Sequence, residues 1–207
     1  PSSAPPAEGW PVVLLLDGDR WLDLGIGAIA AELAVAGTAF LTLLHQPTDR
    51  VAEYTCIQEW VSRATAAIGA VGNLWPVTGG AIVAGQSLGG LAAVHAQCSA
   101  PDVFAASLSQ SGSFWWASHD PDADGARWLT RTIAEHQPRL GSVWLEAGLR
   151  EHDQAEQSAE LAGALAALPQ PPRLFSTTFD GGHDWACWRA GLAEALTWAL
   201  PDPGVTR

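Results

Sequence analysis

The stretch Gly85-Gln86-Ser87-Leu88-Gly89 places a serine between two glycines, directly after a short apolar run. This G-x-S-x-G pattern is typical of a sharp turn between a strand and a helix, where small neighbours leave the serine hydroxyl exposed above a sheet. A serine hydroxyl becomes a good nucleophile only when a base takes its proton. The pattern therefore predicts a nucleophile at Ser87, and it directs the search to a histidine and an acid.

His183 is the histidine that best suits the role of base. It follows the last predicted strand in the stretch FDGGHDW, where paired glycines let the loop bend toward the serine. In this architecture the acid and then the histidine follow the serine along the chain. The other histidines precede the serine, lie on helices or in loops away from a strand end, or come too early in that order: His45, His95, His119, His136 and His152.

The acid should follow the strand before the histidine loop, in SVWLEAGLREHDQ. Glu151 ranks first, because it lies three residues past Gly148, where a carboxylate can orient the imidazole. Asp153 ranks second, since it can instead cap the next helix. Glu146 falls within the end of the strand, and a Ser–His pair without a strong acid stays open as an alternative.

A negatively charged oxygen forming on the substrate needs two aimed N–H donors. The amide of Leu88, directly after the nucleophile, is one candidate. The other should come from the loop after an early strand, and LLLDGDRW offers the amides of Gly18 and Asp19. The sequence does not choose between these two.

The positions of these residues require strands that alternate with helices. Apolar runs ended by turn residues predict buried strands, at 11–16, 38–44, 79–85, 104–112, 142–148 and 173–179. Helical spacing is expected at 26–37, 51–68, 122–136, 153–167 and 184–200. This order predicts an α/β fold with a mostly parallel sheet covered by helices on both faces. We expect a single domain over 1–207, with 1–10 as a loop or terminal arm.

Composition excludes several classes of function. The formal net charge is −12, with 10 Lys and Arg against 22 Asp and Glu, so we expect no nucleic-acid partner. No apolar stretch is long enough to span a bilayer, so we expect no membrane partner. The three cysteines are widely spaced without a CxxC pair, which favours free thiols in a reducing compartment. No metal site and no cofactor are expected.

Several stretches resemble the signatures of the enterochelin esterase family, within a broader group similar to esterase D. They are VAGQSLGGLAA, LSQSGSFWW, LEAGLRE, DGGHDWACWRAGL, LLLDGDRW and DRVAEYTC, in the family's order. The resemblance implies an α/β-hydrolase fold and a cytoplasmic serine esterase that cuts a catecholate trilactone siderophore. It implies Ser87 as nucleophile, His183 as base, Glu151 as acid and Asp19 as the second oxyanion donor. Family members usually carry further strands or a domain before LLDG, which this sequence lacks.

The same blocks contain aromatic and basic residues that suit an anionic aromatic ligand. Tryptophan can stack on a catechol ring, and the planar fork of arginine pairs with oxyanions. The candidate substrate-binding residues are Arg20, Trp21, Arg50, Trp115, Trp116, Arg150, Trp188 and Arg189. Each is open to a structural role instead, as a core aromatic or a salt-bridge partner. The iron would arrive as part of this small-molecule substrate, in its ferric form, unless the iron-free siderophore is the one bound.

Two alternative functions remain. One is a general carboxylesterase or acyl-transfer enzyme of the esterase D type, which would turn over small esters and no trilactone. The other is a siderophore-binding module without catalysis, which the presence of Ser87, His183 and Glu151 disfavours.

Overall fold

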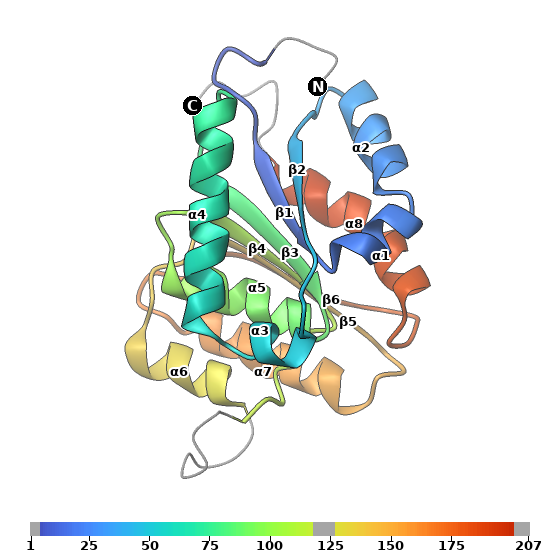
Figure 1. The fold of residues 1–207 in the computed structure, drawn as a ribbon. Helices are drawn as coiled ribbons and strands as arrows, with labels where there is room; N and C mark the ends of the chain where they lie inside the picture. Colours follow the sequence, from blue (N-terminus) through green and yellow to red (C-terminus); the bar gives the residue numbers. More distant parts are fainter. Residues whose placement is uncertain (1–4, 118–126, 201–207) are drawn as a thin grey trace.

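The computed structural model describes residues 5–117 and 127–200, and its centre is a six-stranded sheet (Figure 1). The strands are β1 (Val12–Leu16), β2 (Leu41–His45), β3 (Ala81–Gln86), β4 (Phe104–Gln110), β5 (Ser142–Gly148) and β6 (Arg173–Phe179). All neighbouring pairs run parallel, in the order β2-β1-β3-β4-β5-β6. The carboxyl ends of the strands therefore meet at one edge, and the predicted α/β class is confirmed.

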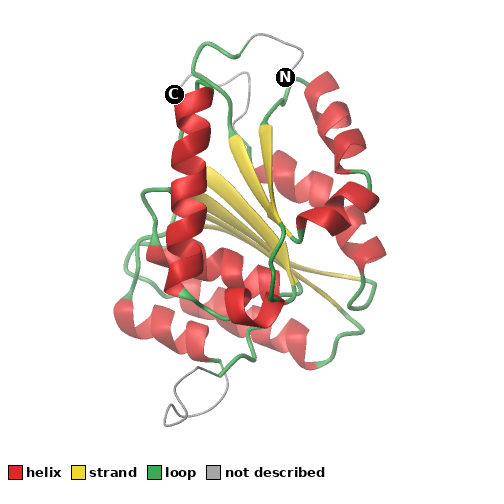
Figure 2. Ribbon diagram, in the orientation of Figure 1, coloured by secondary structure: helices red, strands yellow, loops and turns green. Residues whose placement is uncertain are grey.

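Helices cover both faces of the sheet (Figure 2). One layer contains α1 (Gly18–Asp23), α2 (Ile26–Val35) and α8 (Trp185–Ala199). The other contains α3 (Arg50–Tyr54), α4 (Gln58–Leu74), α5 (Leu88–Ser99), α6 (Trp128–His136) and α7 (Asp153–Ala166).

Strand β1 shows why the sheet reads as continuous apolar runs. Its residues Val13 and Leu15 pack in the core beneath α2 and α8, while Leu14 and Leu16 pack in the core on the opposite face. Successive side chains of a strand point to opposite faces. A strand covered on both faces therefore tends to be apolar at successive positions, not only at alternate ones.

Two local features differ from the sequence-based expectation. The predicted helix over 51–68 is divided into α3 and α4, because Cys56 has a left-handed backbone with φ 62° that interrupts the helical path. The predicted loop after β1 contains the short helix α1, which starts after Asp17, another left-handed residue with φ 59°. Helices α2, α7 and α8 match their predicted ranges to within two residues, and α6 begins at Trp128 within the range 122–136, of which 122–126 lies outside the described residues.

The sheet is not equally protected along its width. Strand β3 is buried at every position, whereas β6 is an edge strand with exposed or half-buried residues throughout. Ser87 thus follows a central strand, and His183 follows an edge strand. Within the described ranges, no helix combines the length and the apolarity needed to cross a membrane.

The turn from β3 to α5 has the strained geometry that the sequence pattern predicts. Ser87 has φ 58° and ψ −121°, an unusual conformation for a residue with a side chain. Gly85 lies so close to Gly89 that a Cβ on Gly85 would overlap the Gly89 carbonyl group. A Cβ on Gly89 would meet its nearest neighbours, which include Leu16, at an ordinary 3.5 Å. The two glycines of the motif therefore have different roles.

We expect Gly85→Ala to lower the free energy of unfolding by about 3 kcal/mol, because the backbone of Gly89 cannot move away without displacing α5. The matched variant Gly89→Ala should change it by less than about 1 kcal/mol, since the contact is ordinary and alanine favours a helix. Urea unfolding of both variants measures the difference. Equal losses in the two variants would contradict this account.

Candidate active site

The sequence-predicted residues gather at the carboxyl edge of the sheet. Ser87 follows β3, Glu151 lies in the loop after β5, and His183 lies in the loop after β6. Parallel strands bring these three loops to one side of the molecule, although they are far apart in the chain. Ligands of open parallel sheets bind at this edge.

A short hydrogen bond joins the predicted acid to the predicted base. The His183 Nδ1 atom and the Glu151 Oε2 atom are 2.6 Å apart, and the Glu151 side chain is fully buried. The other oxygen, Oε1, accepts hydrogen bonds from the Gly148 amide and the Ser111 hydroxyl, each at 2.6 Å. The carboxylate is thus held in one orientation, with Oε2 left for the imidazole.

The two other acids considered for this role lie elsewhere. Asp153 is the first residue of α7, after the loop that carries Glu151. Glu146 is buried and accepts hydrogen bonds from Gln110 Nε2 at 2.6 Å and Trp144 Nε1 at 3.0 Å. Burial raises the pKa of Glu146. The structure therefore brings Glu151, and neither alternative, to His183.

The Ser87 hydroxyl lies 3.3 Å from the hydroxyl of Ser113, a buried residue that sequence reasoning missed. Backbone hydrogen bonds fix this arrangement, since the Ser87 amide donates to the Gln110 carbonyl at 3.1 Å and the Ser113 amide donates to the Ser87 carbonyl at 3.0 Å. Hydrogen bonds among the described residues do not include one between Ser87 and His183. In enzymes without substrate such bonds are often long.

The candidate oxyanion donors come from two helix starts. Leu88 is the first residue of α5, so its amide has no partner within that helix. In the first turn of α1, the Asp19 amide donates to the side chain of Gln46 at 3.1 Å. A substrate oxygen would have to replace Gln46, which is exposed.

Arg50, predicted to bind substrate, is instead engaged within the protein. Its guanidinium donates to both carboxylate oxygens of Asp17, at 2.7 and 2.8 Å, and to the Gln86 carbonyl at 3.0 Å. The Asp17 amide donates to the hydroxyl of buried Tyr54 at 3.1 Å. Arg50 therefore ties Asp17, which precedes α1, to the end of β3, which precedes α5.

Two of the four candidate tryptophans are buried within the protein. Trp21 is fully buried and donates from Nε1 to Gln86 Oε1 at 3.2 Å. Trp188 is 3% exposed and donates from Nε1 to Ser111 Oγ at 2.9 Å. Both were expected beside the substrate, and both lie beneath the site. Burial of a large apolar ring is favourable, and this decides where each side chain points. Trp115 is 44% exposed, and its ring centre lies 5.8 Å from that of half-buried Trp116.

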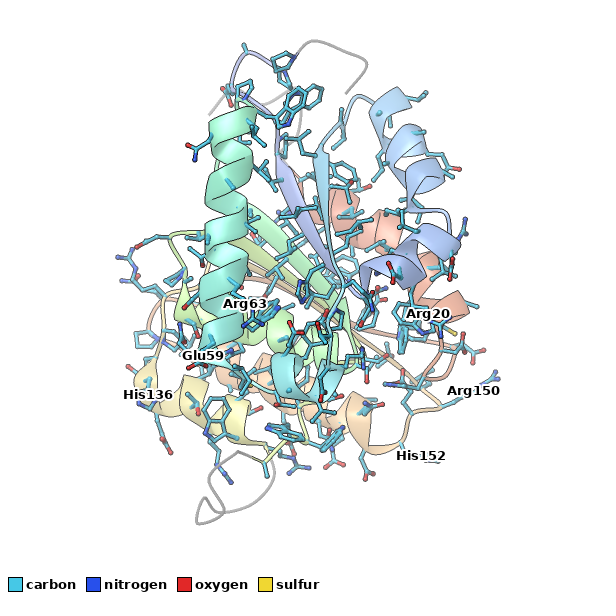
Figure 3. The ribbon with its side chains drawn as sticks, viewed as in Figure 1. Arg20, Glu59, Arg63, His136, Arg150 and His152 are labelled. Carbon is cyan, nitrogen blue, oxygen red and sulfur yellow. The ribbon has the colours of Figure 1, made fainter. Side chains whose placement is uncertain are left out.

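The remaining candidate arginines lie on the surface. Figure 3 shows Arg20, on α1, and Arg150, in the loop after β5, on the same side of the molecule. Arg150 pairs with Asp180 at 2.9 Å, and both side chains are mostly exposed. Arg189 donates from Nε to the Leu24 carbonyl at 2.8 Å. Arg20 is exposed, with no hydrogen bond or ion pair of its guanidinium to other described residues.

A row of buried polar side chains lies beneath the site and was not predicted. Gln86, Gln110 and Glu146 occupy matching positions on β3, β4 and β5. Gln86 Nε2 donates to Gln110 Oε1 at 2.9 Å, and Gln110 Nε2 donates to Glu146 Oε1 at 2.6 Å. Each lies near the end of its strand, shortly before the loop that follows. Because these residues fall within strands, the sequence does not show that their side chains meet.

In the described part of the chain, no three His, Cys, Asp or Glu side chains gather in a way that could hold a metal ion.

Similarity to known proteins extends over most of the chain. The family model described as "Putative esterase" matches residues 71–199. The iron(III) enterobactin esterase of Escherichia coli (strain K12) is 30% identical over 200 residues, which cover 92% of this chain and 50% of that protein.

Solved structures of enterobactin esterases are also similar to this chain. The ferric enterobactin esterase of Salmonella typhimurium matches with a TM-score of 0.81 and 29% identity, over 94% of this chain and 51% of that one. The enterobactin esterase of Shigella flexneri, solved in the presence of enterobactin, matches with a TM-score of 0.80 and 30% identity, over 92% and 51%. The fold is thus an α/β-hydrolase fold, and the chain spans about half the length of the curated relatives it matches.

None of the other histidines is predicted to be the base. His45 pairs with Glu53, and the Trp60 indole donates to it. His136 ends α6 and His152 precedes α7, while His119 lies outside the described residues. His95 is buried on α5, and burial lowers its pKa to about 4.

We expect His95 to make stability depend on pH. The unfolded chain binds a proton at His95 near its ordinary pKa of 6.5, while the folded protein resists it until about pH 4. Stability from this residue is therefore complete above pH 6.5 and falls as the pH drops, by about 3 kcal/mol at pH 4. Urea midpoints at pH 7, 5.5 and 4.5 should fall less steeply in His95→Gln than in the wild type. Parallel pH curves for the two proteins would refute this role.

Proposed function

The chain belongs to the esterase family, and from this premise we propose that it is a serine esterase that hydrolyses the ester bonds of a catecholate trilactone siderophore, releasing its iron. The observation that carries the proposal is the 2.6 Å hydrogen bond between Glu151 and His183, at the sheet edge that also holds the Ser87 turn. A buried carboxylate held against an imidazole, at the same sheet edge as a half-buried serine, suits the roles that acyl transfer requires.

In the proposed reaction the Ser87 hydroxyl attacks the ester carbonyl carbon while His183 Nε2 accepts its proton. Glu151 holds the Nδ1 proton of the ring and stabilises the imidazolium that forms. The carbonyl oxygen becomes negative and accepts hydrogen bonds from the amides of Leu88 and Asp19. The ester C–O bond then breaks, and His183 returns the proton to the leaving alkoxide. Water, activated by His183, releases the acyl group from Ser87 in the same two stages.

The Asp19 amide is the donor that substrate binding would change. Its present acceptor, Gln46 Oε1, is an exposed side chain that can turn into water. Exchange of one acceptor for another costs little, whereas a donor aimed at the developing oxyanion is worth about 2.7–4 kcal/mol of transition-state stabilisation. Arg50 supports this role indirectly, because it holds the Asp17 loop against the end of β3.

Recognition of the substrate is assigned to exposed groups. The protein carries a net charge of −12, so an anionic ferric catecholate needs local cations to approach it. Arg20 and Arg150 provide them, and Trp115 provides an exposed ring for stacking, with Trp116 beside it. We leave Trp21, Trp188 and Arg50 out of this set because their side chains are committed within the protein.

The proposed location is the cytoplasm, where iron released from an imported siderophore is used. The three thiols, Cys56, Cys98 and Cys187, are all free, as is usual in a reducing compartment.

We expect the protein to convert enterobactin to linear trimer, dimer or monomer units, measured by mass-resolved hydrolysis beside Ser87→Ala. Products with the wild type and none with Ser87→Ala would establish the substrate and the nucleophile together. Labelling of Ser87 by a fluorophosphonate probe without any cleavage of enterobactin would overturn the substrate and favour a general carboxylesterase. Tight binding of the ferric siderophore without labelling or cleavage would favour a binding module.

The choice of acid is tested by a matched pair of variants. Glu151→Gln keeps the shape of the side chain but removes the charge that stabilises the imidazolium, so kcat should fall by about 10²–10⁴-fold. Asp153→Asn, two residues along, should keep kcat within about threefold of the wild type, since Asp153 does not contact His183. A large loss in Asp153→Asn with little effect in Glu151→Gln would reverse the assignment.

A further inference from the structure

Ser111, directly after β4, has a backbone conformation that normally favours glycine. Its φ is 50°, in the left-handed region, and its side chain is fully buried. A residue with a Cβ held there costs of order 1 kcal/mol or more. The neighbouring Gly112 does not occupy the left-handed position, and it is needed for space instead, since a Cβ there would lie 2.5 Å from Phe114 and from the Ser109 hydroxyl.

The hydroxyl of Ser111 makes two hydrogen bonds that explain why a serine is retained. It donates to Glu151 Oε1 at 2.6 Å and accepts from Trp188 Nε1 at 2.9 Å. Its amide also donates to the Glu146 carbonyl at 2.6 Å, which anchors the residue to the end of β5. The hydroxyl therefore links the acid of the site to a tryptophan of α8.

That tryptophan is also in contact with the base. The Trp188 ring lies 4.8 Å from the His183 ring, centre to centre, at an interplanar angle of 86°. Its carbonyl accepts a hydrogen bond from Gln110 Nε2 at 2.8 Å, so both its backbone and its ring are fixed. The plane of the imidazole is thus set by a ring that Ser111 holds in place.

We propose that Ser111 is a positioning residue of this site: its hydroxyl fixes the Glu151 carboxylate directly and the ring of His183 through Trp188. The inference rests on the proposed function, since it assigns Ser111 a role in aligning the acid and the base. Ser111 does not touch the substrate, because its side chain is fully buried beneath Glu151 and His183. Its loss misaligns the proton transfer and leaves binding unchanged.

Two substitutions separate this role from a purely structural one. Ser111→Gly removes the hydroxyl and relieves the left-handed strain, whereas Ser111→Ala removes the hydroxyl and keeps the strain. The melting temperature of the glycine variant should therefore lie at or above that of the alanine variant. Both should react with a fluorophosphonate probe about 10–100-fold more slowly than the wild type, the usual penalty of misplaced reacting groups. With enterobactin, kcat should fall in both and KM should not change.

The labelling rate decides the outcome, with Ser87→Ala as the blank. Ser111→Gly labelled within about twofold of the wild-type rate would overturn the proposal, because activity would then not require the hydroxyl. Since labelling needs no siderophore, a wild type that is labelled but leaves enterobactin intact overturns the proposed substrate and still permits this comparison. A wild type that is not labelled overturns both.

A double-mutant cycle tests the part of the proposal that runs through Trp188. Trp188→Phe keeps a ring against His183 and removes the N–H that Ser111 accepts. Because the two residues share one hydrogen bond, Ser111→Gly combined with Trp188→Phe should be labelled no more slowly than the slower single variant. Full additivity of the two losses would show that the residues act separately.

Discussion

The site depends on a set of main-chain hydrogen bonds that continue the sheet past the ends of its strands. The Ser87 amide donates to the carbonyl of Gln110, and the Ser111 amide donates to the carbonyl of Glu146. The turn after each strand is therefore registered against the end of the next strand. The side chains of Gln86, Gln110 and Glu146 repeat this connection one layer below. The proposed nucleophile, Ser87, and the residue that holds the proposed acid, Ser111, are thus parts of one hydrogen-bonded frame.

This frame shows what the sequence can reveal about the fold. Strands buried on both faces appear as mainly apolar runs, so β1, β3 and β5 are visible without any structure, although β3 contains Gln86 and β5 contains Glu146. The break at Cys56 is not visible, because apolar spacing continues across it and a left-handed backbone leaves no mark in the residue type. Helix α1 is also hidden in the sequence, because Asp17 before it and Gly18 at its start are residues typical of a turn.

For the site, the sequence predicts the positions of residues better than the directions of their side chains. Chain order and strand ends locate Ser87, His183 and Glu151, because these depend on the topology of a parallel sheet. The direction of a side chain depends on packing instead, which spacing does not record. The sequence therefore suggests Trp21, Trp188 and Arg50 as ligand-binding residues. In the structure the two tryptophans are buried and Arg50 is hydrogen-bonded to Asp17 and the Gln86 carbonyl. The opposite holds for Ser111, whose role depends on a φ angle and two partners distant in the chain.

The proposed base, His183, follows an edge strand, and this position has a consequence for how the protein loses its structure. Strand β3 is enclosed by neighbours, whereas β6 has a neighbour on one side and exposed residues along its length. Regions with few buried contacts open before the rest of a domain, in sub-global fluctuations that hydrogen exchange detects. The loop that carries His183 belongs to such a region. The proposed base therefore lies beside a less protected edge of the sheet, while the proposed nucleophile follows a fully buried central strand.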